Sequence, residues 1–173
     1  MRLLSDQPSD SGEASTRGRV FAYRQALGRA SRNRVVCQVG LGKLPLWLMA
    51  LRSGARRVYC IDADRLALQA AQALAIRQGF GRDQLLLLEG LVREVSPPEP
   101  FDIIVSEPFH HLGLQSHIGR TLSHARRHFL KPEGLFIPSR VTCYAALASP
   151  KAWRTYVDSQ RDDVAGLVGL TPS

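Results

Sequence analysis

Two short segments of the chain carry residue types that suit the binding of a nucleoside. Gly40 and Gly42 follow the apolar run 35–39 and precede a predicted helix. Glycines at such a turn let the backbone turn sharply and approach a ligand closely, and the N-terminus of the following helix favours negative charge. Asp62, roughly 20 residues further on, ends the next apolar run, where a carboxylate can accept hydrogen bonds from both ribose hydroxyls. Together these features predict a nucleoside site.

A structural alternative exists for the same residues. The glycines would then serve only a strand-to-helix turn, and Asp62 would only cap the following helix. Asp64, two residues later, already offers a side chain that can cap this helix. Asp62 is therefore available for a ligand.

Glu107 is a third candidate, just past another apolar run and flanked by Ser106 and Pro108. A carboxylate in that place can position a cation or take a proton. The alternative is a solvated loop glutamate without a chemical role. Its location beside the expected site favours the chemical role.

The histidines form a separate group. All five lie between His110 and His128, and His124 and His128 have a spacing compatible with a metal ion. No cysteine or carboxylate accompanies them on the predicted helix face, so we expect no metal site. We expect instead a polar, basic helix face that they share with Arg120, Arg126 and Arg127.

The elements that must position these residues follow from the hydrophobic pattern. Short apolar runs alternate with helical patterns, which predicts a parallel sheet covered by helices on both faces. The fold class is α/β, a Rossmann-like doubly wound and mostly parallel sheet flanked by helices. Ligands of such sheets bind outside the carboxyl ends of the strands, where Gly40, Asp62 and Glu107 fall. We expect strands at 35–39, 57–61, 85–88, 102–106 and 135–137, and helices at 19–30, 45–51, 64–78 and 116–130.

Longer motifs carry a resemblance to a known family. Residues 35–42 and 53–62 resemble the class I S-adenosylmethionine-dependent methyltransferases. Residues 101–107 (FDIIVSE) and 130–140 (LKPEGLFIPSR) more specifically resemble the protein arginine methyltransferase family. The resemblance covers about residues 19–148. It implies a methyltransferase-type Rossmann-like fold, S-adenosyl-L-methionine as cofactor, and methyl transfer to a nitrogen of protein arginine.

The resemblance also implies roles for individual residues of the cofactor site. Arg19 would hold the carboxylate of the cofactor. Gly40 and Gly42 would form the loop under its methionine part, and Asp62 would bind its ribose.

Further along the chain, the resemblance implies two adenine contacts and one catalytic residue. Val92 and Arg93 would lie in the segment that contacts the adenine. Glu107 corresponds to the first glutamate of the family's paired-glutamate loop. It would orient the acceptor amine and help to remove its proton.

Three positions depart from the family pattern. Gln38 stands in place of an acidic residue, Leu44 replaces the third glycine of the loop, and Ser116 lies where the second glutamate should fall. We expect Leu44 to narrow the space around the cofactor. Two carboxylates suit a planar guanidinium, so the loss of one predicts weaker and less well oriented arginine binding.

These departures leave two alternatives open. The first is a catalytically inactive methyltransferase-like module that serves interaction or dimerisation. The second rests on the turn 106–109, which is similar to that of enzymes that methylate amino groups of RNA or DNA bases.

Length and composition fit one globular domain. The chain has 173 residues, 45% of them hydrophobic and 22% charged, which excludes wholesale disorder. We expect a flexible leader over 1–17, a methyltransferase-like domain over 18–148, and a C-terminal extension over 149–173 that at most begins the family's β-barrel. Cys37, Cys60 and Cys143 lie in apolar runs without CxxC spacing, so we expect reduced core residues.

Charge and apolar runs bear on location and partners. The longest apolar run, 44–51, is far shorter than a membrane span, and the N-terminus lacks the apolar stretch of a signal peptide. We therefore expect a cytoplasmic protein, or a nuclear one in a eukaryote, without a membrane partner. The net charge is +8, and only Lys43, Lys131 and Lys151 are lysines.

This arginine-rich excess suits a polyanion such as RNA, whereas a cationic arginine substrate should prefer an acidic groove. A compositional bias towards arginine is the alternative. The expected partners are an arginine-bearing protein substrate and RNA. A homodimer is also expected if the full protein has the family's barrel and dimerisation arm.

Overall fold

The computed structural model describes residues 11–107, 109–110, 113–114, 118–141, 149, 151 and 154, with the backbone alone for 11–17, 109–110 and 113–114. The chain divides into two compact units. One consists of residues 1–19 and 143–173, and the other of residues 20–142. The second unit contains the whole five-stranded sheet.

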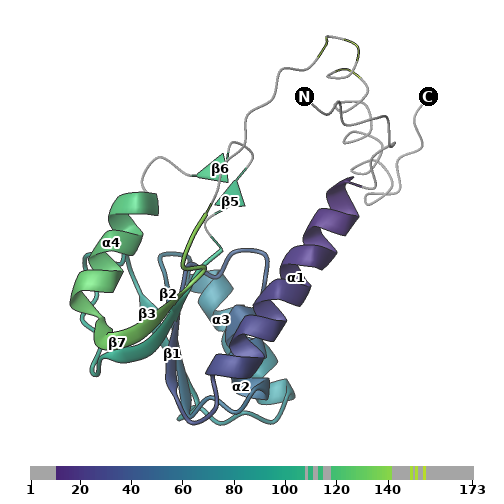
Figure 1. Cartoon of the computed structure of the whole chain (residues 1–173). Coiled ribbons are helices and arrows are strands. Elements are labelled where there is room, and N and C mark those ends of the chain that lie inside the picture. The colour runs from purple at the N-terminus through teal and green to yellow at the C-terminus, as the bar shows by residue number, and fades with distance from the viewer. Residues whose placement is uncertain are drawn as a thin grey trace. The chain divides into compact units, whose positions relative to one another are not determined.

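The predicted parallel sheet is confirmed. Its order is β3-β2-β1-β4-β7, and every neighbouring pair is parallel (Figure 1). The central position of β1 places the end of this strand between those of β2 and β4. The strands are β1 (Val35–Val39), β2 (Arg57–Asp62), β3 (Leu85–Glu89), β4 (Phe101–Val105) and β7 (Leu130–Ile137). A separate antiparallel pair that the sequence pattern did not predict consists of β5 (Phe109–His110) and β6 (Gly113–Leu114).

Helices cover both faces of the sheet. The helices are α1 (Ser11–Ala30), α2 (Leu46–Arg52), α3 (Arg65–Arg77) and α4 (Ile118–His128). Side chains of α1 from Val20 onwards, α2 and α3 pack in one apolar cluster with Val36 and Val58. Ala125 of α4 packs in a second cluster with Val35 and Cys37. Because alternate residues of β1 belong to different clusters, both faces of this strand are buried, as the expected doubly wound fold requires.

Local chemistry explains where α3 begins and ends. Asp64 is its N-cap, with Oδ1 accepting hydrogen bonds from the backbone N–H groups of Leu66 and Ala67 at 2.9 and 3.2 Å. Gly79, just past the C-cap Gln78, has a φ of +83°, a conformation that glycine adopts without strain. The predicted helix is confirmed at both ends.

Other boundaries differ from the sequence-based expectation. α1 begins at Ser11, so the backbone of residues 11–17 is helical although these residues were assigned to a leader. The amino-acid sequence of residues 11–17 has no apolar periodicity, which is the signal that predicts a helix. β7 begins at Leu130 because Phe101 pairs with Leu130, after which a shift in register brings Ile103 opposite Leu135.

The cysteine prediction is confirmed where it can be followed. Cys37 and Cys60 are free and buried, and burial raises the pKa of both thiols. Cys143 lies outside the described residues. None of the helices in the described part of the chain is long and apolar enough to span a membrane.

Candidate functional site at the carboxyl ends of the strands

The glycine loop after β1 and Glu107 after β4 lie together. Gly40 and Gly42 have φ values of +75° and +51°, the left-handed region that glycine enters readily. A Cβ atom added to Gly42 would lie 3.4 Å from Oε2 of Glu107. A Cβ atom added to Gly40 would meet nothing within 4 Å, so there is open space beside this part of the loop. The loop therefore borders both the Glu107 carboxylate and open space.

Asp62 joins the end of β2 to the same loop. Its Oδ2 accepts a hydrogen bond of 2.6 Å from the backbone N–H of Leu41, and its Oδ1 accepts one of 2.8 Å from that of Asp64. A carboxylate has about four lone-pair sites, so each oxygen can accept a further hydrogen bond. Asp62 is partly exposed. It can thus organise the loop and still bind the hydroxyl groups of a ribose.

Gln38, which sequence reasoning treated only as a departure from the family, is central to the loop. Its side chain is fully buried. Its Nε2 donates to the carbonyl oxygens of Gly40, Leu41 and Leu44 at 2.9, 3.0 and 3.2 Å. Its Oε1 accepts from the backbone N–H of Trp47 at 2.7 Å. No sequence signal indicates these bonds, because they depend on the path of the loop backbone.

Leu44, which we expect to narrow the space around the cofactor, is buried, and its effect on that space stays a prediction. Its side chain is 8% exposed and belongs to the apolar cluster that includes Leu46 and Leu41. The third-glycine position of the motif thus contributes to the core.

Ser106 fixes the backbone immediately before Glu107. Its carbonyl oxygen accepts a bond of 2.7 Å from the Tyr23 hydroxyl of α1. Its Oγ donates to the carbonyl of Val39 at 2.9 Å, and its N–H donates to the carbonyl of Ile137 at 3.0 Å. Elements from three parts of the chain therefore hold the residue that precedes the candidate catalytic carboxylate. Sequence reasoning noted Tyr23 only for its place on an apolar helix face.

The turn after β3 lies beside Asp62. The N–H of Gly90 donates to the backbone carbonyl of Asp62 at 2.9 Å. Val92 is buried in the cluster on the α4 face, while the Arg93 side chain is exposed. The turn therefore lies beside Asp62, the residue assigned to the ribose. The contact of this turn with the adenine stays a prediction.

Arg93 also lies near the histidine pair of α4. The rings of His124 and His128 have centroids 4.3 Å apart. Desolvation and the positive charges of His128, Arg93 and Arg127 lower the pKa of His124. Arg120, Arg126 and Arg127 are exposed on the same helix, as expected for a basic face.

Three further expectations have different outcomes. Arg19 lies in α1, one turn before Tyr23, and belongs to the unit formed by residues 1–19 and 143–173, so its role stays a prediction. Ser116 lies outside the described residues. Within the described residues, no group of three or more His, Cys, Asp or Glu side chains could hold a metal ion.

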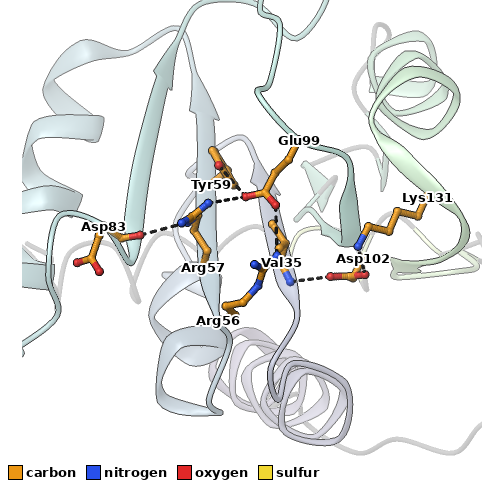
Figure 2. Close-up of polar contacts among 8 residues, drawn as sticks. All are labelled: Val35, Arg56, Arg57, Tyr59, Asp83, Glu99, Asp102 and Lys131. Carbon is orange, nitrogen blue, oxygen red and sulfur yellow. Dashed lines mark hydrogen bonds and ion pairs between the residues drawn. The ribbon is translucent and has the colours of Figure 1, made fainter.

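A second polar cluster lies where the strands begin, at the other end of the strands from the candidate site (Figure 2). Glu99 Oε1 accepts from Arg57 at 2.7 Å and from the Tyr59 hydroxyl at 3.0 Å. Asp102 accepts from Lys131 at 2.6 Å and from the Val35 N–H at 2.8 Å. This cluster joins strand starts and lies away from the candidate site.

No protein-family model matches the chain, but curated proteins do. A probable protein arginine N-methyltransferase 6 of Arabidopsis thaliana is 32% identical over 151 residues, which cover 84% of this chain and 34% of that protein. The histone-arginine methyltransferase CARMER of Aedes aegypti is 31% identical over 131 residues, covering 74% of this chain and 22% of that protein. The chain thus spans about a third or less of the length of these relatives.

The chain is also similar to solved structures of protein arginine methyltransferases. Arabidopsis thaliana protein arginine methyltransferase 10 matches with a TM-score of 0.64 and 29% identity, covering 72% of this chain and 36% of that one. The Trypanosoma brucei PRMT1 enzyme-prozyme heterotetrameric complex with AdoHcy matches with a TM-score of 0.63 and 27% identity, covering 76% of this chain and 43% of that one. By sequence and by fold, the chain is similar to protein arginine methyltransferases over about a third of their length.

Proposed function

We propose that the chain binds S-adenosyl-L-methionine and transfers its methyl group to a nitrogen of a protein arginine side chain. The observation that carries this proposal is the meeting of the glycine loop, Asp62 and Glu107 at one edge of the sheet. The names of the relatives and the AdoHcy in one similar structure support both the reaction and the cofactor.

The site chemistry fits this cofactor. The open space beside Gly40 allows a ligand to approach the loop backbone. Asp62 retains lone pairs for ribose hydroxyls after its two bonds to backbone N–H groups. Arg19 would pair with the cofactor carboxylate, and Val92 and Arg93 would border the adenine. The bound cofactor supplies an activated methyl group on a sulfonium.

Glu107 is the residue that we assign to the acceptor. Its carboxylate lies against Gly42, beside the loop that would hold the methionine part of the cofactor. From there it can accept a hydrogen bond from a guanidinium and hold one nitrogen in line with the methyl carbon. It can also take the proton that this nitrogen loses when the new N–C bond forms.

Transfer of a labelled methyl group to an arginine-containing basic peptide tests this assignment. Glu107→Gln should lower the transfer rate by about 100-fold or more, the range expected for a positioned acid–base group. Binding of S-adenosylhomocysteine should remain, because Glu107 is assigned to the acceptor. Glu133→Gln, the same change at an exposed position of β7, is the control and should leave the rate unchanged.

The outcomes separate the competing functions. Equal rates for wild type and Glu107→Gln would remove Glu107 from the mechanism. Cofactor binding without transfer to any peptide would favour the inactive module, which the serine at position 116 motivates. Transfer to RNA but not to peptide would favour the base-methylating alternative, and a matched lysine peptide checks for arginine specificity.

A further inference from the structure

The side chain of Gln38 hydrogen-bonds to four backbone groups of the candidate cofactor loop and of the helix that follows it. Its two amide protons face three carbonyl oxygens, those of Gly40, Leu41 and Leu44, at 2.9–3.2 Å. An amide NH₂ group donates two hydrogen bonds, so its donors are fully used. The left-handed conformations of Gly40 and Gly42 give the loop the path on which these carbonyls converge.

The other end of the Gln38 amide acts on α2. Its Oε1 accepts from the N–H of Trp47, the second residue of this helix. The N-cap residue of α2 is Pro45, and its side chain makes no capping bond. The first N–H groups of a helix lack intrahelical partners, so Gln38 satisfies one of them from outside the helix. One buried side chain thus ties the loop to the helix that follows it.

Leu41 connects Gln38 to Asp62, the carboxylate assigned to the ribose. Its carbonyl accepts from Gln38, and its N–H donates to Asp62 Oδ2 at 2.6 Å. The next residue, Gly42, lies against Glu107. A shift of the loop would therefore change both the orientation of Asp62 and the place of Glu107.

From these contacts we infer that Gln38 is a positioning residue for cofactor binding: its uncharged amide holds the loop in the conformation that orients Asp62. This inference rests on the proposed function, because cofactor affinity is its main readout. An ionised carboxylate at position 38 could not hold the loop in this way, since it has no proton to donate to three carbonyl oxygens.

Two variants of similar size test the inference. Gln38→Met removes the amide, and Gln38→Glu keeps one oxygen but loses the donors when ionised. At pH 8 both should weaken the binding of S-adenosylhomocysteine, measured by calorimetry, by about tenfold or more, as expected for the loss of buried hydrogen bonds. Gln69→Glu, the same change at an exposed position of α3, is the matched control and should bind as wild type does.

The pH dependence separates positioning by hydrogen bonds from a general loss of packing. The carboxyl group introduced by Gln38→Glu can donate to a loop carbonyl when it is protonated, and burial favours the protonated form. Affinity of Gln38→Glu should therefore recover towards the wild-type value between pH 8 and pH 6, whereas Gln38→Met should not recover. In the part of the chain that the structure describes, the titratable or charged groups in or beside the loop include Tyr23, Lys43, Cys60, Asp62 and Glu107. The wild-type protein has the same groups, so the pH dependence of its affinity is subtracted from that of each variant.

Wild-type affinity in Gln38→Glu and Gln38→Met at pH 8 would overturn the inference while leaving the proposed function intact. If wild type itself fails to bind S-adenosylhomocysteine, the proposed function fails, and amide hydrogen exchange of the free protein then decides about Gln38. The inference requires Gln38→Met to speed exchange at Leu41, whose N–H is bound to Asp62, as well as at Trp47. Faster exchange at Trp47 alone would contradict it. If Gln38→Met does not fold, the affinities of Gln38→Glu at the two pH values decide.

Discussion

Asp62 combines two tasks in one carboxylate, since it accepts hydrogen bonds from the Leu41 and Asp64 N–H groups and is assigned to the ribose. Asp62→Asn replaces one acceptor oxygen by a donor, so one backbone N–H or one ribose hydroxyl loses its partner. Hydrogen bonds to charged groups contribute about 1.5–3 kcal/mol, which corresponds to a loss of cofactor affinity of about tenfold or more. Calorimetry with S-adenosylhomocysteine measures this loss.

Asp64→Asn is the control for that experiment. Asn caps helices about as well as Asp, so this variant should keep both its affinity and its melting temperature. Equal affinities of Asp62→Asn and wild type would remove Asp62 from the cofactor site.

The site residues differ in how far the sequence could reveal them. Gly40, Asp62 and Glu107 each follow an apolar run, and the carboxyl ends of parallel strands meet at one edge, so their proximity could be predicted. Gln38 could not be recognised in this way. Its partners are backbone carbonyls whose directions depend on the path of the loop, which the side-chain pattern does not encode.

At the scale of elements, α1 is linked to the end of β4 by the bond from the Tyr23 hydroxyl to the Ser106 carbonyl. Tyr23→Phe removes this donor from a buried acceptor and should lower the free energy of unfolding by about 1–2 kcal/mol. Because Ser106 precedes Glu107, methyl transfer should fall as well. Urea denaturation and the peptide assay measure the two effects.

Tyr59→Phe is the matched control, because the Tyr59 hydroxyl donates to Glu99 at the opposite edge of the sheet. It should lower stability without changing transfer by the folded protein. Transfer rates that fall equally in both variants would show that stability alone, and not the link to Glu107, controls activity.

Helices and strands whose buried residues recur at a regular interval could be predicted from the sequence. The central strands have both faces in apolar clusters and therefore appear as short apolar runs, and α3 has both a capping Asp64 and a terminating Gly79. The start of α1 and the first half of β7 were missed. The strand pairing of Leu130 with Phe101 is set by the neighbouring strand and by an irregular register, which no local pattern contains.

At the scale of the whole molecule, two carboxylates at the starts of the strands should control acid stability. Partial burial raises the pKa of Glu99, but hydrogen bonds from Arg57 and Tyr59 and the charges of Arg57 and Arg56 outweigh it, so the net pKa is lowered. For Asp102, burial is likewise outweighed by hydrogen bonds from Lys131 and the Val35 N–H and by nearby positive charge, so its pKa is lowered too.

A lowered pKa in the folded state means that the stabilisation is complete above the unfolded-state values, about 4.3 for Glu and 3.9 for Asp. It is lost as the pH falls through the still lower folded-state values. The double variant Glu99→Gln, Asp102→Asn should therefore be less stable at pH 7, and its melting temperature should fall less than that of wild type between pH 5 and pH 3. Parallel curves for the two proteins over this range would contradict the assignment, and the exposed Glu133→Gln serves as control.

The excess of arginine has only a partial explanation in the fold. Arg56 and Arg57 bind Glu99, while Arg120, Arg126 and Arg127 are exposed on α4. The latter side chains make this helix surface positive, a field that would repel a cationic arginine substrate and attract an anion. We therefore expect an arginine acceptor to bind outside the basic face of α4.

The central claim is that the edge formed by the glycine loop, Asp62 and Glu107 binds S-adenosyl-L-methionine. Calorimetric titration of this 173-residue chain with S-adenosyl-L-methionine tests it most directly. The account predicts saturable binding of one cofactor per chain, and weaker binding in Asp62→Asn. No detectable binding at millimolar cofactor by the folded wild-type chain would contradict it.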